Sequence, residues 1–259
     1  MTGTVFAFLR SRWDIVIAGV LLLFGSVQAW LQLQERAYVQ EVTHAVIMEA
    51  GATTPKQKVL ALRDYLRTHV EFKNAPVDNR PFLRATAADT LQSGKGYCGE
   101  VSRTFICMAR VLDIRTQRIN LYGSKPHTVA EVELPDGQNW IVDCQNPPRI
   151  AGLEQLDKVM SKGDYVDYST LNVRRLGVDW LVSRIKLQMG PLTYWSENPH
   201  ALVALFFLSL ASGFLLIRPM RWSVRVVLRR RGWIHESDKA KLMHALNLHG
   251  DIATRGVGA

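Results

Sequence analysis

Two long apolar runs stand near the ends of the chain, and shorter hydrophobic patterns fill the region between them. The first run is Ile15 to Leu31 and the second is Ala201 to Ile217, and neither contains a charged residue. Each is close to the minimum length that a helix needs to cross the hydrocarbon core. Aromatic residues that suit a membrane interface flank both runs, namely Trp13, Trp30, Tyr194, Trp195 and Trp222. We therefore expect transmembrane helices at 15–32 and 199–217; the alternative is a pair of buried core helices.

The region between the runs begins with helical periodicity. Residues 35–51 predict a helix that ends at Gly51. Residues 53–72 predict another, because Thr54 can cap it and Pro55 suits its first turn. From Cys98 onward a third set of apolar residues recurs at helical spacing, and its members are Val101, Phe105, Met108, Ala109 and Leu112.

Strand patterns follow these helices. The segments 116–123, 127–135 and 139–145 are strand candidates, and "PDGQ" between the last two is a turn signal. Helices followed by an antiparallel meander predict an α+β fold. Residues 149–198 are mixed and polar, and 161–169 ("SKGDYVDYS") is expected to be a surface loop.

The formal net charge of +9 is unevenly distributed. Residues 218–259 hold nine Lys or Arg against three acids, and Arg10 and Arg12 precede the first run. Because positive charge marks the cytoplasmic side of a membrane protein, residues 1–14 and 218–259 are expected in the cytoplasm and 33–198 outside it. A basic tail beside an apolar run favours a lipid bilayer as partner over a nucleic acid. Small residues at "VQA", 27–29, leave open that the first run is a cleaved signal peptide.

Cys98 lies near two glycines, Gly96 and Gly99, at the predicted start of a helix. Free N–H groups and the helix dipole at such a position favour a thiolate, and the glycines allow a close approach of backbone and substrate. A reactive cysteine also needs a base and a group that orients the base. His127 begins one strand candidate, and Asp143 lies in the next one on the same face by period-two alternation. The order Cys98, His127, Asp143 is therefore geometrically feasible for a triad.

The segments "GKGYCGEVSRTFICMARVLDI" and "HTVAEVELPDGQNWIVDC" resemble the transglutaminase-like superfamily, which has a papain-type fold. The resemblance covers about residues 50–145. Thr128 and Val129 depart from the small residue and tryptophan that usually follow the histidine, and Gln92 is the one upstream candidate for an oxyanion donor. The residues that match the family motifs are Gly96, Cys98, Gly99, His127, Glu131, Val132, Trp140 and Asp143.

The resemblance implies a membrane-anchored cysteine acyl hydrolase or acyltransferase. Cys98 would attack an amide or ester, His127 would act as base and Asp143 would orient it, with Gly96, Gly99, Gln92 and Trp140 near the substrate. The substrate would be a peptide, a cell-wall peptide or an envelope polymer outside the inner membrane, in the periplasm. The alternative is a non-catalytic transglutaminase-like envelope protein that docks onto a membrane partner for polymer synthesis or export.

The remaining cysteines and histidines suggest structural roles. Cys107 lies nine residues after Cys98, which places it on the opposite face of the predicted helix. Cys144 points away from Asp143. An oxidising compartment would permit a Cys107–Cys144 disulfide, leaving Cys98 as the odd thiol. No histidine shows metal-ligand spacing with a cysteine, so we expect no metal and no other cofactor.

Overall fold

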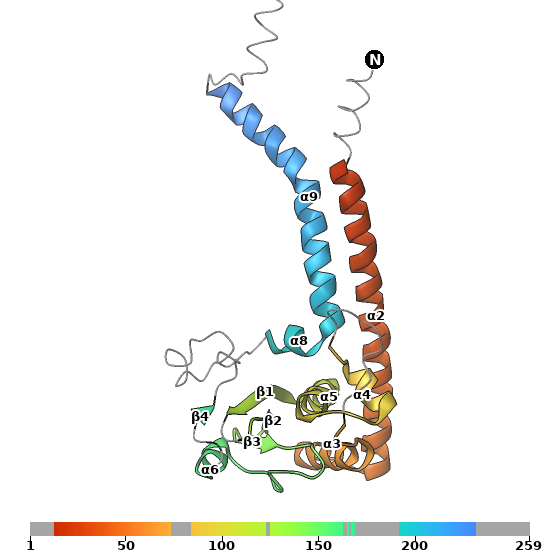
Figure 1. Cartoon of the computed structure of the whole chain (residues 1–259), viewed down its shortest axis with the longest axis vertical. Coiled ribbons are helices and arrows are strands. Elements are labelled where there is room, and N and C mark those ends of the chain that lie inside the picture. Colours follow the sequence, from red (N-terminus) through yellow and green to blue (C-terminus); the bar gives the residue numbers. More distant parts are fainter. Residues whose placement is uncertain are drawn as a thin grey trace, which may run out of the picture. The chain divides into compact units, whose positions relative to one another are not determined.

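The computed structural model describes residues 13–73, 84–122, 125–162, 165, 167–168 and 192–231. The chain forms two compact units, one of Met1–Phe24 with Phe206–Ala259 and the other of Gly25–Leu205. The elements labelled in Figure 1 are α2 (Trp13–Ala50), α3 (Pro55–His69), α4 (Ala87–Ser93), α5 (Cys98–Val111), β1 (Arg115–Tyr122), β2 (His127–Glu133), β3 (Asn139–Val142), α6 (Leu156–Met160), β4 (Asp167–Tyr168), α8 (Leu192–Glu197) and α9 (Pro199–Arg230).

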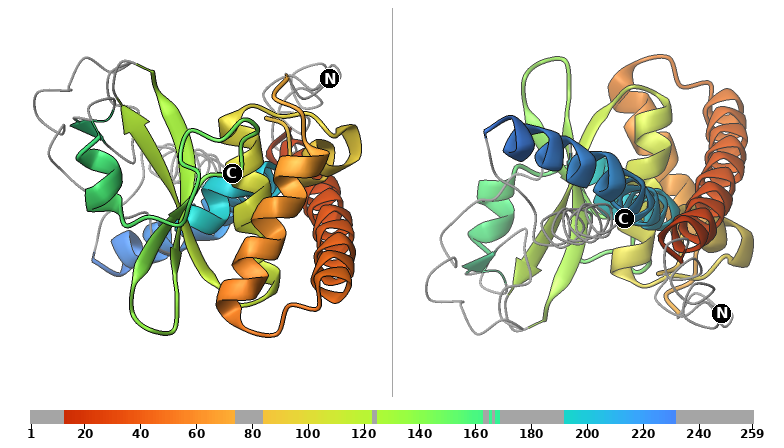
Figure 2. Two further views of the ribbon diagram at one scale, coloured as in Figure 1. Left: turned by 90° about the horizontal axis from the view of Figure 1, so that it is seen from below. Right: turned by 90° about the horizontal axis from the view of Figure 1, so that it is seen from above.

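The sheet has four antiparallel strands in the order β3-β2-β1-β4. Figure 2 shows α5 beside one face of this sheet and α6 beside the other. The three strand candidates are confirmed: β1 begins one residue earlier than expected, and β2 and β3 end at Glu133 and Val142, before the expected ends at 135 and 145. The loop expected over 161–169 instead contains β4, which pairs with Leu121 and Tyr122 at the end of β1. The α+β prediction is confirmed, with helices first and the antiparallel sheet after them.

Two apolar clusters cover the two faces of the sheet. The larger lies between the sheet and the helices α2, α3 and α5, and it includes Leu62, Leu66, Phe105, Val132 and Val142. The smaller lies on the α6 side and includes Ile119, Leu121, Val129, Ile141 and Val159. Because side chains alternate along a strand, β2 contributes Val129 to one cluster and Ala130 to the other. The helix α5 packs on the sheet through the larger cluster, and the Ser102 hydroxyl in its second turn donates to the Thr128 carbonyl near the start of β2 at 2.9 Å.

The helix boundaries follow local capping chemistry. The N-cap Thr54 accepts a hydrogen bond from the Gln57 N–H at 3.3 Å, and Pro55 is the first residue of α3, as predicted. Gly51 follows the end of α2 with a φ of +59°, a left-handed conformation that favours glycine. The helices expected at 15–32 and 35–51 are parts of one continuous helix, α2. The polar residues there have partners, because Gln32 and Glu35 hydrogen-bond to Asn198 and to the backbone of Ala87.

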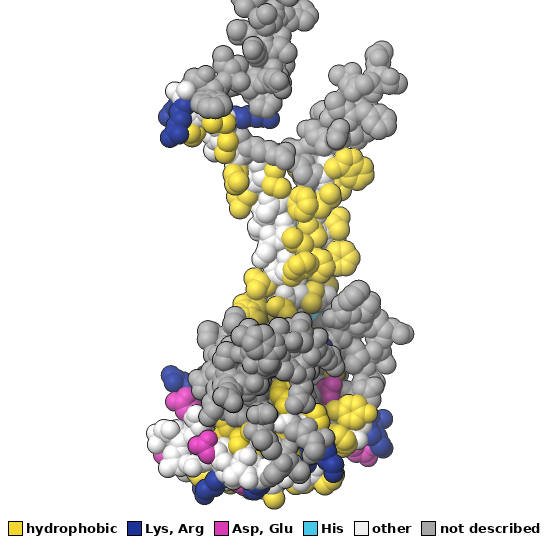
Figure 3. Space-filling view, turned by 60° about the vertical axis from the view of Figure 1, so that its left-hand side comes forward, with side chains coloured by type: hydrophobic (Ala, Val, Ile, Leu, Met, Phe, Trp, Pro, Cys, Tyr) yellow, Lys and Arg dark blue, Asp and Glu magenta, His cyan; other side chains and the backbone are white. Residues whose placement is uncertain are grey.

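Two helices are long and apolar enough to cross a membrane, over Ile15–Ala50 and Pro199–Leu228. Within the most apolar window of each, only 17% and 22% of the residues are buried, which argues against core helices. Figure 3 shows apolar side chains along both helices, and Leu23, Phe206 and Leu216 are among the most exposed. The helix α9 continues past the expected end at 217 and through Pro219 to Arg230.

Candidate active site

Cys98 is the first residue of α5, and its side chain is half-buried. The backbone just before it is fixed, because the Gly96 N–H donates to the Glu71 carbonyl at 3.0 Å and the Tyr97 N–H donates to the Glu100 carboxylate at 2.8 Å. The N–H of Cys98 belongs to the first helical turn and has no acceptor within the helix. A free N–H group and a thiol therefore lie on one residue at the positive end of α5.

His127 and Asp143 form a buried pair. The imidazole Nε2 lies 3.0 Å from Asp143 Oδ2, and the two side chains are 0% and 1% exposed. The register pairs Ala130 with Val142, and its continuation places Val129 opposite Asp143. His127 is therefore the diagonal neighbour of Asp143 on the same face of the sheet, within the reach of long side chains.

Asp143 accepts three further hydrogen bonds, all from backbone N–H groups. Oδ1 accepts from Gln145 at 3.0 Å, and Oδ2 accepts from Arg149 at 2.8 Å and Ile150 at 3.1 Å. Burial disfavours the carboxylate, but His127 and these N–H groups favour it more, so the pKa of Asp143 is lowered. The carboxylate is thus charged and fixed in orientation.

Arg67 on α3 holds the chain segment that carries Asp143. Its Nε and Nη2 donate to the Asp143 carbonyl at 2.9 and 2.6 Å, and the same guanidinium reaches the carbonyls of Ile150 and Ala151 at 3.0 and 3.2 Å. Arg67 was not among the predicted site residues, since an arginine in an amphipathic helix has no distinguishing local pattern. Only the tertiary fold brings it to a loop some eighty residues later.

The thiol of Cys98 and the imidazole of His127 interact electrostatically. Burial alone would raise the pKa of Cys98, but the neighbouring imidazole of His127, together with Thr128, lowers it overall. Burial alone would lower the pKa of His127, but Asp143 and Cys98 raise it to about 9. His127 Nδ1 is buried and has no hydrogen-bond partner within the described residues, because Asp143 holds the other ring nitrogen, Nε2. The arrangement favours a thiolate beside an imidazolium.

Residues 41–144 match the transglutaminase-like superfamily. These residues form a transglutaminase-like domain. No curated protein sequence matches the chain. Among solved structures, the chain is similar to a candidate cysteine protease from Cytophaga hutchinsonii, with 21% identity and a TM-score of 0.36 over 46% of this chain and 41% of that one.

Two other solved structures are similar at the same level. A protein described as a TGase is 17% identical with a TM-score of 0.34, over 46% of this chain and 34% of that one. Legionella pneumophila LapG is 11% identical with a TM-score of 0.36, over 57% of this chain and 94% of LapG. The chain thus spans less than half of the first two proteins. Similarity this low carries no argument about activity.

The transglutaminase-like domain places the four predicted substrate residues in different surroundings. Gly96 is buried, and a Cβ there would lie 3.2 Å from side-chain atoms of Thr90, Glu100 and Val101, so close packing between α4 and α5 requires a glycine. Gln92 on α4 is exposed. Trp140 is half-buried and packs against the larger apolar cluster. The carbonyl of Gly99 accepts a hydrogen bond from Arg118.

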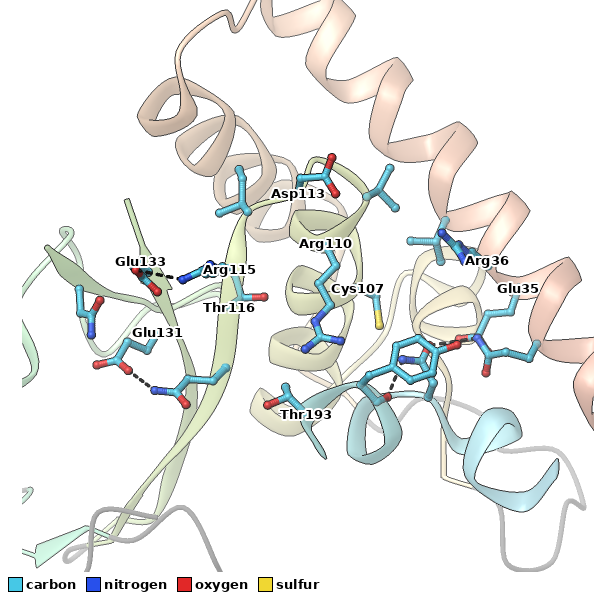
Figure 4. Close-up of a pocket in the computed structure, with 18 residues that line it drawn as sticks. Glu35, Arg36, Cys107, Arg110, Asp113, Arg115, Thr116, Glu131, Glu133 and Thr193 are labelled. Carbon is cyan, nitrogen blue, oxygen red and sulfur yellow. Dashed lines mark hydrogen bonds and ion pairs between the residues drawn. The ribbon is translucent and has the colours of Figure 1, made fainter. Parts of the chain in front are cut away.

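The other two cysteines of the transglutaminase-like domain are free thiols, so the suggested Cys107–Cys144 disulfide is not formed. Cys107 lines a cavity of about 620 Å³ between α2, α5, β1 and α8, and neither His127 nor Asp143 lines this cavity. Figure 4 shows Arg110 and Thr193, which also line it. Burial raises the pKa of Cys107 to about 12, which keeps this thiol protonated. The described part of the chain has no group of three or more His, Cys, Asp or Glu that could hold a metal ion.

Proposed function

We propose that this protein is a membrane-anchored cysteine acyl hydrolase or acyltransferase whose nucleophile is Cys98. The observation that carries the proposal is the orientation of His127. Its Nε2 is held by Asp143 at 3.0 Å, which leaves Nδ1 for the thiol of Cys98. Catalysis by a cysteine nucleophile requires a base beside the thiol and a group that orients the base. Cys98, His127 and Asp143 would fill these three roles.

The reaction would proceed in two steps. The thiolate sulfur of Cys98 attacks the acyl carbon, a bond forms between sulfur and carbon, and the bond to the leaving amine or alcohol breaks. The imidazolium of His127 gives its proton to the leaving group. The neutral imidazole then takes a proton from the incoming water or amine, which attacks the thioester carbon, and the carbon–sulfur bond breaks to release the acyl product and restore the thiolate. The oxyanion in both steps would accept a hydrogen bond from the Cys98 N–H. Asp143 keeps the imidazole in one tautomer and stabilises its charged form.

We further propose that the domain acts outside the cytoplasmic membrane, in the periplasm. The arginines before the first apolar run and after the second support this orientation by the positive-inside rule. The substrate would then be a peptide, a cell-wall peptide or an acylated envelope polymer. Another inner-membrane protein would be the partner if the domain serves for docking rather than catalysis.

The proposal is tested with a simple acyl donor, because the natural substrate is not needed to form the intermediate. The full chain in detergent is mixed with p-nitrophenyl acetate, and peptides are analysed by mass spectrometry at acidic pH. We expect one acetyl group on Cys98 and a burst of p-nitrophenolate that is lost in Cys98→Ser and retained in Cys107→Ser. An absence of acetylation at Cys98 in the folded protein would overturn the catalytic proposal and favour the docking role.

A further inference from the structure

Arg118 on β1 contacts the catalytic helix directly after Cys98. Its Nη2 donates to the Gly99 carbonyl at 2.9 Å. A Cβ built at Gly99 would lie 3.5 Å from Arg118 Nη1, an ordinary van der Waals distance, so the guanidinium lies directly beside the first turn of α5. The same guanidinium donates through Nε to Glu197 Oε1 at 2.7 Å and through Nη2 to Oε2. One planar side chain therefore bridges α5 and α8.

Glu197 is a buried carboxylate, with 1% of its side chain exposed. Arg103 Nε lies 3.4 Å from Oε2, and the Ser196 hydroxyl donates to Oε1 at 3.1 Å. Burial opposes its ionisation, but the two arginines outweigh burial, so the pKa of Glu197 is lowered. Removing one arginine would leave part of the Glu197 charge buried without a partner, which is costly. The ion pairs therefore hold Arg118 and Glu197 in one arrangement.

Glu197 lies where the chain enters α9, so the Arg118 bridge connects the start of α5 to this entry point. Glu197 ends α8, and α9, a candidate membrane-spanning helix, begins two residues later at Pro199. The junction is fixed to α2, because Gln32 donates to Asn198 at 3.0 Å and accepts from the Ala201 N–H at 3.1 Å. The start of the catalytic helix and the start of α9 are thus joined through two side chains, Arg118 and Glu197.

We propose that Arg118 is a positioning residue for Cys98, which ties the first turn of α5 to Glu197 at the entry to α9. The inference rests on the proposed function, since it assumes that Cys98 is the nucleophile. The planar guanidinium can bond the Gly99 carbonyl and the Glu197 carboxylate at once, whereas a lysine could serve only one of them well. The attachment of α9 in a membrane would then help to set the position of the thiol relative to His127.

The test measures how fast Cys98 reacts with iodoacetamide in full chains purified in detergent. The readout is alkylation at pH 5.5, resolved by peptide mass spectrometry, because it reports the thiolate fraction without a substrate. We expect Arg118→Met to react about tenfold more slowly than wild type, which corresponds to a rise of one unit in the pKa of the thiol. Arg118→Lys should recover only part of the rate. Combining Arg118→Met with Glu197→Gln should add no further loss, because both changes break the same link.

Met108→Ala is the matched control, since Met108 is fully buried in α5 and far along the helix from Cys98. It should lower thermal stability without slowing alkylation. A wild-type rate in folded Arg118→Met, an equal loss in Met108→Ala, or additive losses in the double variant would each overturn the positioning role. If wild-type Cys98 itself fails to react at pH 5.5, the proposed function fails, and this inference fails with it.

Discussion

His127 Nε2 lies 3.0 Å from Asp143 Oδ2, and neither side chain is more than 1% exposed. The Asp143 carboxylate also accepts hydrogen bonds from three backbone N–H groups, so its orientation does not depend on the histidine. The histidine, in contrast, depends on the carboxylate, because Asp143 is the largest of the influences that raise its pKa to about 9. The backbone therefore fixes Asp143, and Asp143 in turn stabilises the charged imidazole of His127.

The first prediction concerns Asp143→Asn. An amide carries no charge, so the pKa of His127 should fall from about 9 and the thiolate should lose a charged partner. The amide group also leaves at least one N–H donor without an acceptor, which should cost about 1–3 kcal/mol of stability. We expect acetylation of Cys98 by p-nitrophenyl acetate to slow at least about a hundredfold.

Asp136→Asn is the matched control for this variant. Asp136 accepts a hydrogen bond from the Gln138 N–H at 3.0 Å in an exposed turn between β2 and β3. The same substitution there should leave acetylation unchanged. Acetylation at the wild-type rate in folded Asp143→Asn would show that the aspartate does not support the chemistry.

The second prediction is a pH dependence of stability. The folded state raises the pKa of His127 from 6.5 to about 9, so the resulting stability is fully present below pH 6.5 and is lost as the pH rises through 9. The pKa of Asp143 is lowered, so its contribution is present above its usual pKa of 3.8 and is lost in stronger acid.

The measurement compares melting temperatures of Cys98→Ser and Cys98→Ser/His127→Gln from pH 5 to pH 10. The serine background removes the titrating thiol from both chains. We expect the advantage conferred by His127 to be largest near pH 5–6 and to be lost between pH 6.5 and pH 9, because the serine background removes the share of the rise in the His127 pKa that Cys98 supplies. A constant difference across this range would contradict the raised pKa.

The third prediction concerns Arg67→Ala. The loss of the guanidinium leaves carbonyls of Asp143, Ile150 and Ala151 without this donor, and the loop that carries the carboxylate should loosen. We expect the free energy of unfolding to fall by roughly 2–3 kcal/mol and acetylation of Cys98 to slow. Lys56→Ala removes an exposed cation from the first turn of the same helix and should change neither quantity. Equal behaviour of the two variants in denaturant unfolding would refute the role of Arg67.

The fourth prediction concerns membrane topology. A reporter fused after Ala259 should be active in the cytoplasm, and one inserted at Gly137 in the exposed turn should be active outside it. The reason is the concentration of arginines after the second apolar run. Paired alkaline phosphatase and fluorescent protein fusions at each position measure this directly. An exported C-terminal reporter would contradict the proposed orientation.

The fold was predictable where the signal is local or periodic. Thr54, Pro55 and Gly51 mark helix ends by capping chemistry, and alternation along β2 and β3 predicts the strands that carry His127 and precede Asp143. The single helix α2 was not predicted, because the uncharged apolar run ends at Leu31 and the more polar segment from Glu35 predicts a separate helix. Gln32 and Glu35, which lie where the two segments join, have partners near α9 and α4 that only the tertiary fold supplies.

The same limit applies to the candidate site. The sequence order of Cys98, His127 and Asp143 suggests a triad, but the supporting groups come from distant parts of the chain. Arg67 binds the Asp143 carbonyl, and Arg118 joins Gly99 to Glu197. Neither arginine has a local pattern that separates it from surface cations. Contacts of this kind depend on tertiary packing, so only the structure reveals them.

The central claim is that Cys98 carries an activated thiolate, and the most direct measurement is the pH profile of its alkylation in the wild-type chain. Iodoacetamide labelling is followed from pH 4 to pH 10, with Cys107 as an internal reference in the same molecule. We predict that Cys98 reacts at mildly acidic pH, with a midpoint below the ordinary cysteine value of about 8.5, while Cys107 stays unreactive throughout. A Cys98 profile with its midpoint at or above the ordinary value, or a rate no greater than that of Cys107, would contradict the account.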